Sequence, residues 1–129
     1  MIIIEGEPKG KQRPRFGQGH TYTPKETKDY ERLIHDTWIW EKKRTYHGYV
    51  RVKIRAYFGI PKSYSKSVKL AMAEGDRRPA KRPDIDNIAK IILDGLNGAA
   101  FDDDAQVVEA SIEKWYSDHP RVEIEVREI

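Results

Sequence analysis

Residues 49–58 alternate strictly between apolar and polar side chains, and no other part of the chain constrains the fold as strongly. The apolar side chains fall on one face of an extended chain, at Val50, Val52, Ile54, Ala56 and Phe58. A period of two residues is typical of a strand with one face against a hydrophobic core. We therefore predict a half-buried strand that ends at Pro61, in a sheet covered on one side.

Other segments of the N-terminal half carry weaker signals. Met1–Gly6 is mostly apolar and predicts a short strand, and residues 7–20 predict a loop or a hairpin arm with His20–Tyr22 as its returning strand. Thr23 and Glu26 form a capping-box pattern around Pro24, so a helix should begin there and run to about Arg44. The helical spacing of three and four residues is traced by Tyr30, Leu33, Ile34, Thr37, Trp38 and Glu41.

The C-terminal half predicts two helices and two strands. Ser65 would cap a short helix that reaches Glu74, and Asp84 or Asp86 would open a second helix that ends near Leu96. The expected apolar face of that second helix consists of Ile85, Ile88, Ile92 and Leu96, backed by Ala89. Val107–Trp115 and Val122–Val126 should be strands, joined as a hairpin through Asp118–Pro120.

These elements predict an α/β fold of the α+β type, a mixed β-sheet packed by helices within one small domain, 1–129. The chain contains no cysteine, which excludes disulfides, thiolate metal sites and a cysteine nucleophile. No apolar run approaches the roughly 20 residues of a membrane span. We expect a soluble, cytoplasmic protein that uses no organic cofactor.

Charge is distributed unevenly along the chain. The arm has four cations in seven residues, Lys9, Lys11, Arg13 and Arg15, and residues 61–82 hold seven cations against two acids. Residues 84–104 instead hold six aspartates against Lys90 alone. A polyanionic substrate and a metal ion would account for this pattern, because the cations bind phosphates and the acids bind the metal.

The acidic segment suggests a metal site at its two ends. Asp84 and Asp86 open the predicted helix, and a short turn after that helix returns the chain through Asp102, Asp103 and Asp104, so the two clusters would converge. Oxygen ligands without cysteine or histidine suit Mg²⁺, with Mn²⁺ as a substitute. His20, His35, His47 and His119 lack metal-like spacing. Taken singly, each aspartate also fits a helix cap or a solvated turn.

Several motifs together closely resemble the RusA family of Holliday junction resolvases. The resemblance lies in Arg82–Lys90, Leu93–Gly98 and Asp103–Gln106, with further likeness at Lys11–Arg15 and Thr21–Pro24. It implies a homodimeric Mg²⁺-dependent endonuclease that cuts four-way DNA junctions, bacterial or phage-encoded and associated with the nucleoid. Two identical subunits suit two matched cuts.

The resemblance also implies roles for particular residues. Asp84, Asp86 and Asp104 would be the metal carboxylates, Asp103 an auxiliary acid, and Lys90 a functionally required lysine. The family shows a pair of acids where this chain has three, so the choice among Asp102, Asp103 and Asp104 stays open, with Asp104 as our prediction.

The basic segments and the tryptophans complete the predictions. We expect DNA contacts from Lys9, Lys11, Arg13, Arg15, Arg77, Arg78, Lys81 and Arg82, with Phe16 pressing on a base pair at the branch point. Trp38 continues the helix stripe, whereas Trp40 lies off it and would suit a subunit interface. The competing readings are a nuclease for flaps or forks, a non-catalytic DNA-binding module, and a calcium-stabilised domain.

Overall fold

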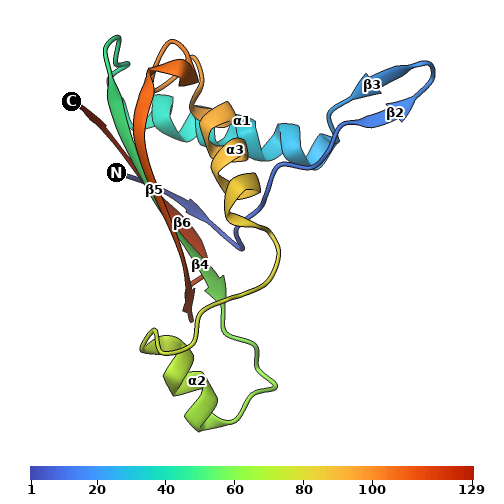
Figure 1. The fold of residues 1–129 in the computed structure, drawn as a ribbon, viewed down its shortest axis with the longest axis vertical. Coiled ribbons are helices and arrows are strands. Elements are labelled where there is room, and N and C mark those ends of the chain that lie inside the picture. The colour runs from blue at the N-terminus through green and yellow to red at the C-terminus, as the bar shows by residue number, and fades with distance from the viewer.

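The computed structural model describes residues 1–129 as a mixed sheet with two helices packed on one face and two projections (Figure 1). The elements, in chain order, are β1 (Ile2–Glu5), β2 (Arg15–Gly17), β3 (His20–Tyr22), α1 (Lys25–Trp40), β4 (Val50–Gly59), α2 (Lys66–Ala73), α3 (Ile85–Leu96), the 3-10 turn η1 (Asp104–Gln106), β5 (Val107–Ser117) and β6 (Arg121–Glu128). The main sheet has the order β1-β6-β4-β5, and β2 pairs with β3 separately. The predicted fold class is confirmed.

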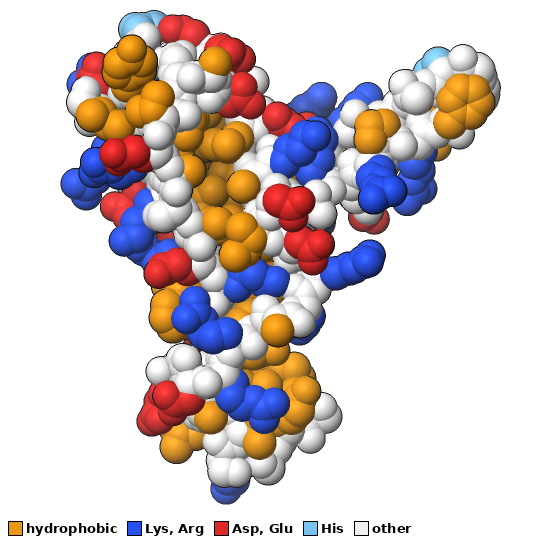
Figure 2. Space-filling view, viewed as in Figure 1, with side chains coloured by type: hydrophobic (Ala, Val, Ile, Leu, Met, Phe, Trp, Pro, Cys, Tyr) orange, Lys and Arg blue, Asp and Glu red, His pale blue; other side chains and the backbone are white.

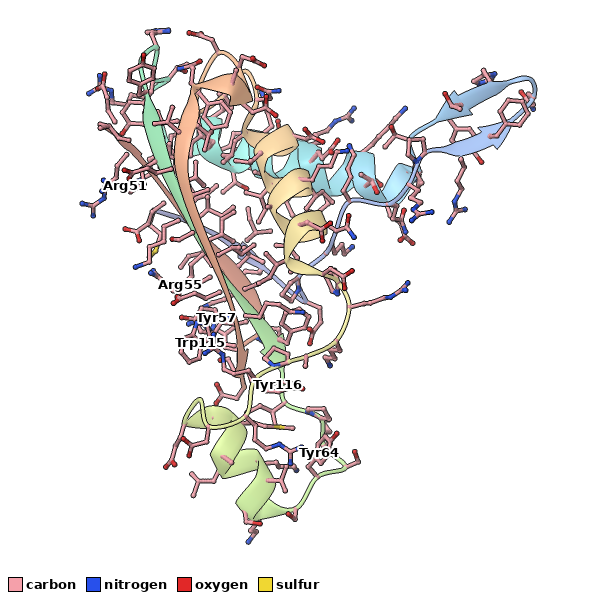
Figure 3. The ribbon with its side chains drawn as sticks, viewed as in Figure 1. Arg51, Arg55, Tyr57, Tyr64, Trp115 and Tyr116 are labelled. Atoms are coloured by element: carbon pink, nitrogen blue, oxygen red, sulfur yellow. The ribbon has the colours of Figure 1, made fainter.

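β4 is a central strand of the sheet and has the predicted two faces. Val50, Val52, Ile54, Ala56 and Phe58 are all buried in the core beneath α1 and α3. Arg51, Arg55 and Tyr57 project from the opposite face of the sheet (Figure 3). There Arg55 donates a hydrogen bond from Nε to Glu123 Oε1 on β6 at 2.9 Å. This face therefore carries cross-strand ion pairs of Arg55 with Glu123 and Glu125, beside the ring of Tyr57.

β5 and β6 do not form the predicted hairpin, because β4 lies between them. β4 pairs with β5 in parallel, from Val50↔Val107 to Gly59↔Ser117, and with β6 in antiparallel orientation. Asp118–Pro120 instead crosses the end of β4, at the point where the chain leaves the sheet after Gly59. The parallel pairing requires a long crossover, and residues 60–106 supply it with α2 and α3.

α1 is shorter than predicted at both ends. It begins at Lys25 with Pro24 as the preceding cap and without a side-chain capping bond, so the Thr23–Glu26 capping box is absent. It ends at Trp40, because Lys42 takes a left-handed conformation with φ 54°. The chain then folds back, and the indole Nε1 of Trp38 donates to Arg44 O at 3.1 Å.

α3 packs against α1 and the sheet through Ile88, Ile91, Ile92 and Leu96, all buried. Ile85 was predicted on this face but is 45% exposed, and Ile91 takes the buried position. The two helices approach closely at Gly95, where an added Cβ would lie 2.9 Å from Ile34 Cβ and 3.0 Å from Glu31 O. Gly95, which lies in the segment Leu93–Gly98, is thus required by the packing of the two helices.

The two projections agree with the sequence. β2 and β3 form the predicted hairpin arm, which extends away from the sheet. α2 begins after Ser65, whose hydroxyl accepts a hydrogen bond from Val68 N at 3.4 Å, and the chain turns at Gly75. None of the helices combines the length and hydropathy needed to cross a bilayer.

Candidate active site

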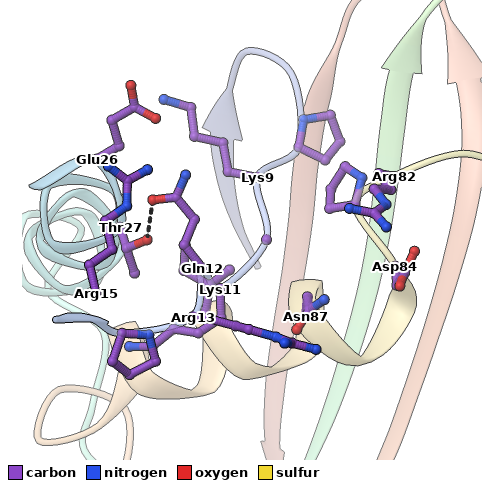
Figure 4. A pocket seen from close by; sticks show the side chains of 15 residues that line it. Lys9, Lys11, Gln12, Arg13, Arg15, Glu26, Thr27, Arg82, Asp84 and Asn87 are labelled. Carbon is purple, nitrogen blue, oxygen red and sulfur yellow. Dashed lines mark hydrogen bonds between the residues drawn. The ribbon is translucent and has the colours of Figure 1, made fainter. Parts of the chain in front are cut away.

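A cleft of about 960 Å³ lies where the N-terminal arm passes the start of α3. Its lining is almost entirely polar and includes the cations Lys9, Lys11, Arg13, Arg15 and Arg82, together with Asp84 and Asn87 (Figure 4). Basic side chains gather at the base of the arm and around the acidic pair in the middle of this face (Figure 2). The cleft therefore joins the predicted basic arm, the basic loop and one predicted metal ligand.

The floor of the cleft depends on close backbone contact. Lys11 N donates to Asn87 O at 2.8 Å, which fixes the arm against the first turn of α3. At Gly10 an added Cβ would lie only 2.7 Å from Pro83 Cβ and 3.1 Å from Asn87 Cβ. Glycine is needed here because any side chain would push the arm away from the residues that precede Asp84.

Asp84 and Asp86 occupy the open end of α3. Asp84 precedes the helix in an extended conformation, and its side chain makes no capping hydrogen bond. Asp86 lies in the first turn, and both side chains are exposed. Asp84 therefore occupies the N-cap position without making a capping bond, and its carboxylate is free to bind a cation. The helix dipole adds positive potential at this end, which favours an anionic side chain.

The acidic run 102–104 divides into three different environments. Asp102 Oδ2 lies 2.8 Å from His47 Nδ1. Asp103 caps η1, accepting from Ala105 N at 3.4 Å, while Gln106 returns the contact by accepting from Asp103 N at 2.9 Å. Asp104 is exposed and pairs with no other side chain. The three acids are thus not equivalent, and Asp104 is the one without another role.

Gln106, the last residue of the Asp103–Gln106 segment, holds the acidic turn in place. Its Oε1 accepts from the backbone of Asp102 and Asp103, at 2.8 and 2.9 Å. Its Nε2 donates to Tyr46 O and Gly48 O, at 3.0 and 2.8 Å. Gln106 therefore ties the acidic turn to the segment before β4, and its role is structural.

The two acidic clusters do not converge within one chain. The acidic run follows the C-terminal end of α3, where Gly98 N donates to Phe101 O at 2.8 Å, whereas Asp84 stands at the N-terminal end. A helix of 12 residues is about 18 Å long. No group of three or more acidic or histidine side chains is close enough together to hold a metal ion.

Lys11 and Lys90, both singled out from the sequence, have contrasting surroundings. The Lys11 ammonium lies 2.5 Å from Glu31 Oε2 and 3.1 Å from Asp94 Oδ2, and the Lys11 side chain is only 17% exposed. Burial alone would lower the pKa of Lys11, but the hydrogen bonds and charges of those two carboxylates outweigh it and raise that pKa. Lys90 is exposed and pairs with neither Asp86 nor Asp94.

The basic loop before Asp84 is held against the sheet by aromatic side chains. The Arg78 guanidinium lies 3.4 Å from the centre of the Trp115 ring, and its Nε donates to Lys114 O at 2.6 Å. Arg77 stacks over Tyr64, and Lys81 lies 5.7 Å from the ring centres of both Phe58 and Tyr116. These contacts define the loop, and Arg82 alone of the four predicted cations lines the cleft.

Aromatic side chains lie on the arm and at the C-terminal end of α1. Phe16 on β2 is 75% exposed, and Tyr22 on β3, which lies opposite Arg15, is also exposed. Trp38 is buried as predicted, whereas Trp40 is 70% exposed. No pattern in the sequence indicated Gly10 or Lys114, because their roles depend on contacts between distant segments.

Comparisons with known proteins agree with this geometry. The family model described as "Endodeoxyribonuclease RusA" matches residues 5–127. A protein of Bacillus subtilis (strain 168), described as "Uncharacterized protein YqaN", is 34% identical over 135 residues, covering 99% of this chain and 95% of that protein. Both matches extend over nearly the whole chain.

Proposed function

The chain belongs to the RusA endodeoxyribonuclease family, and we propose that it cuts four-way DNA junctions with the help of Mg²⁺. Membership makes it a hydrolase that acts on DNA. One observation supports the site: the cleft places the uncapped carboxylate of Asp84 beside Lys9, Arg13, Arg15 and Arg82. A carboxylate that can hold a metal ion, next to cations that can bind phosphate, suits metal-assisted phosphodiester hydrolysis.

The donor set at the start of α3 fits Mg²⁺. Asp84 and Asp86 are exposed carboxylates without ion-pair partners, and Mg²⁺ is typically held by one or two carboxylates, with waters and substrate phosphate completing its shell. When bound, Mg²⁺ would supply an activated water and offset the charge that develops on the scissile phosphate. Mn²⁺ would substitute, because it accepts the same oxygen ligands.

The cations of the cleft would position the DNA strand. Lys9, Arg13 and Arg15 lie on the arm side, and Arg82 lies directly before Asp84, so a strand that follows them passes the metal ligands. Lys11 is neutralised by Glu31 and Asp94, and we assign it to fixing the arm instead of gripping phosphate. Lys90, which has no carboxylate partner, would orient the attacking water or stabilise the leaving oxygen.

Asp104 would complete the site from a second copy of the chain. Its own chain holds it about one helix length, roughly 18 Å, from Asp84. In a homodimer, each subunit would place its Asp104 near Asp84 of the partner subunit. The two carboxylates would then bind one metal ion despite their separation within a chain. The homodimer would also supply the two matched sites that a two-fold junction requires.

The test is a cleavage assay on synthetic DNA with the full-length protein. A four-way junction, a flap and a linear duplex are compared with and without Mg²⁺, with each strand labelled in turn. We expect paired, symmetric nicks in the junction only when Mg²⁺ is present. Preferred cutting of the flap would assign the enzyme to other branched DNA.

Asp84→Asn tests the site itself. The variant should lose cleavage by about 100-fold or more while it still binds the junction, because the groove cations remain. Asp29→Asn, an exposed aspartate of α1, is the matched control and should cut normally. Cutting by Asp84→Asn at the rate of that control would reject the proposed site.

A further inference from the structure

Lys114 occupies an unexpected position on β5. In the parallel register with β4, Ile112 lies opposite Ile54, Lys114 opposite Ala56 and Tyr116 opposite Phe58. Ile54, Ala56 and Phe58 all face the core. A lysine therefore stands in the core-facing row of the strand, where the pattern calls for an apolar residue.

The ammonium of Lys114 binds the segment that leads to the predicted metal ligands. Lys114 Nζ donates to Lys81 O, three residues before Asp84. It also lies 5.1 Å from the centre of the Phe58 ring. The partly buried Lys114 is thus directed from the sheet toward the start of α3, and its donor proton holds the backbone that presents Asp84.

The electrostatic surroundings agree with that placement. Burial lowers the pKa of Lys114, and the negative charge of Asp84 opposes this shift while the positive charge of Lys81 adds to it. Asp84 is the one acid whose charge acts on Lys114 to this extent. The same strand supports the loop a second time, since Lys114 O accepts from Arg78 Nε.

We propose that Lys114 is a positioning residue of the nuclease site, which holds the Lys81 carbonyl and sets the approach of Asp84 to the metal. This inference rests on the proposed function and extends it to a residue outside every motif described above. Lys114 acts through Lys81 and Asp84, so its loss should affect the chemical step and leave the grip on DNA intact.

An alternative role would also place a lysine here. β5 is an edge strand of the main sheet, and an inward-pointing charge on an edge strand discourages pairing with another chain. That role predicts that removing the charge causes self-association and leaves the rate per folded molecule unchanged. The two roles therefore predict different measurements.

The experiment compares Lys114→Met, Lys114→Arg and Lys53→Met in the full-length protein. Lys53 lies on β4 and faces solvent on the other side of the sheet, so its variant controls for loss of one lysine. For Lys114→Met we expect kcat on the junction to fall about 10- to 100-fold, as for other small misplacements at a site. Its junction Kd should change less than about twofold, and Lys114→Arg should recover part of kcat.

Three outcomes would overturn the proposal: a kcat equal to that of Lys53→Met, a parallel loss of kcat and junction binding with no rescue by arginine, or self-association with a normal rate. Should Lys114→Met fail to fold, Lys114→Gln should show the same selective loss, because its side chain is one bond shorter and its amide cannot reach the Lys81 carbonyl. Asp84→Asn distinguishes a failure of the proposed function from a failure of the proposed role of Lys114. If that variant cuts normally, the proposed function fails, and if it is inactive while Lys114→Met cuts normally, only the role of Lys114 fails.

Discussion

Lys11 and Asp94 form an ion pair of 3.1 Å that joins the N-terminal arm to α3. Lys11 lies in the basic segment Lys11–Arg15, and Asp94 lies in the segment Leu93–Gly98. Glu31 of α1 binds the same ammonium at 2.5 Å. The pair thus connects two segments that the sequence assigned to separate functions. It holds the arm, α1 and α3 together behind the cleft.

Lys11→Met should therefore reduce stability more than DNA affinity. The pair is partly buried, so its loss should cost about 1–2 kcal/mol, between the values for exposed and buried pairs. The melting temperature should fall by roughly 3–10 °C in a calorimetric scan. Lys28→Met, on the exposed surface of α1, should melt as the wild type does.

Arg13→Met should change the salt dependence of junction binding. An arginine that contacts one phosphate contributes a slope of about −0.9 to the plot of log Kobs against log salt concentration. The slope should become shallower by about that amount in Arg13→Met and stay unchanged in Lys11→Met. Equal slopes for the wild type and Arg13→Met would remove Arg13 from the DNA interface.

Mixing Asp84→Asn with Asp104→Asn subunits should restore cutting. If each site combines Asp84 of one copy with Asp104 of the other, a mixed dimer has one doubly damaged site and one intact site. It should nick a single strand of the junction, although each variant alone is inactive. Inactive mixed dimers would indicate that each chain builds its own site, or that the assembly is different.

Gly10→Ala should disturb the cleft without touching a charged residue. The new methyl would lie 2.7 Å from Pro83 Cβ, so the arm or the segment before Asp84 must move. We expect a stability loss of about 1–3 kcal/mol, typical of overpacking, together with slower cleavage. Gly48→Ala is the control, because its added Cβ would make only an ordinary contact of 3.6 Å with Glu128 Oε1, and it isolates the steric effect at Gly10.

Glu123 should contribute to stability in a pH-dependent way. Burial would raise the pKa of Glu123, but its hydrogen bonds with Arg55 and Arg121 outweigh this and lower the pKa below the usual 4.5. A lowered folded pKa gives stability that is present above about pH 4.5 and is lost as the pH falls through the folded value. In acid titrations followed by circular dichroism, Glu123→Gln should lose less stability between neutral and acidic pH than the wild type.

The sequence predicted local features well wherever one pattern determined one element. The alternation in β4 and the Ser65 cap each depend on neighbouring residues only, and each appears in the structure. The apolar repeat of α3 also appears, with Ile91 buried and Ile85 exposed. The end of α1 was not predictable in this way. It depends on the left-handed conformation of Lys42 and on the bond from Trp38 to Arg44 O, which no repeat encodes.

Most contacts between distant segments could not be predicted from the sequence. A three-residue connection such as Asp118–Pro120 is typical of a hairpin, and nothing local indicates that β4 lies between the two strands. For the same reason the sequence treated Lys11 as a free cation. Its partners Glu31 and Asp94 became evident only with the fold.

The parallel pairing of β4 with β5 also determines when the enzyme can become active. Residues 60–106, which carry both acidic clusters, form the loop that this pairing closes. Closing so long a loop costs entropy before any contact compensates for it, so the pairing should form late in folding. During synthesis the aspartates emerge before β5, and they can be held in place only after Lys114 has left the ribosome. A nascent chain would therefore remain inactive toward DNA until β5 has been synthesised.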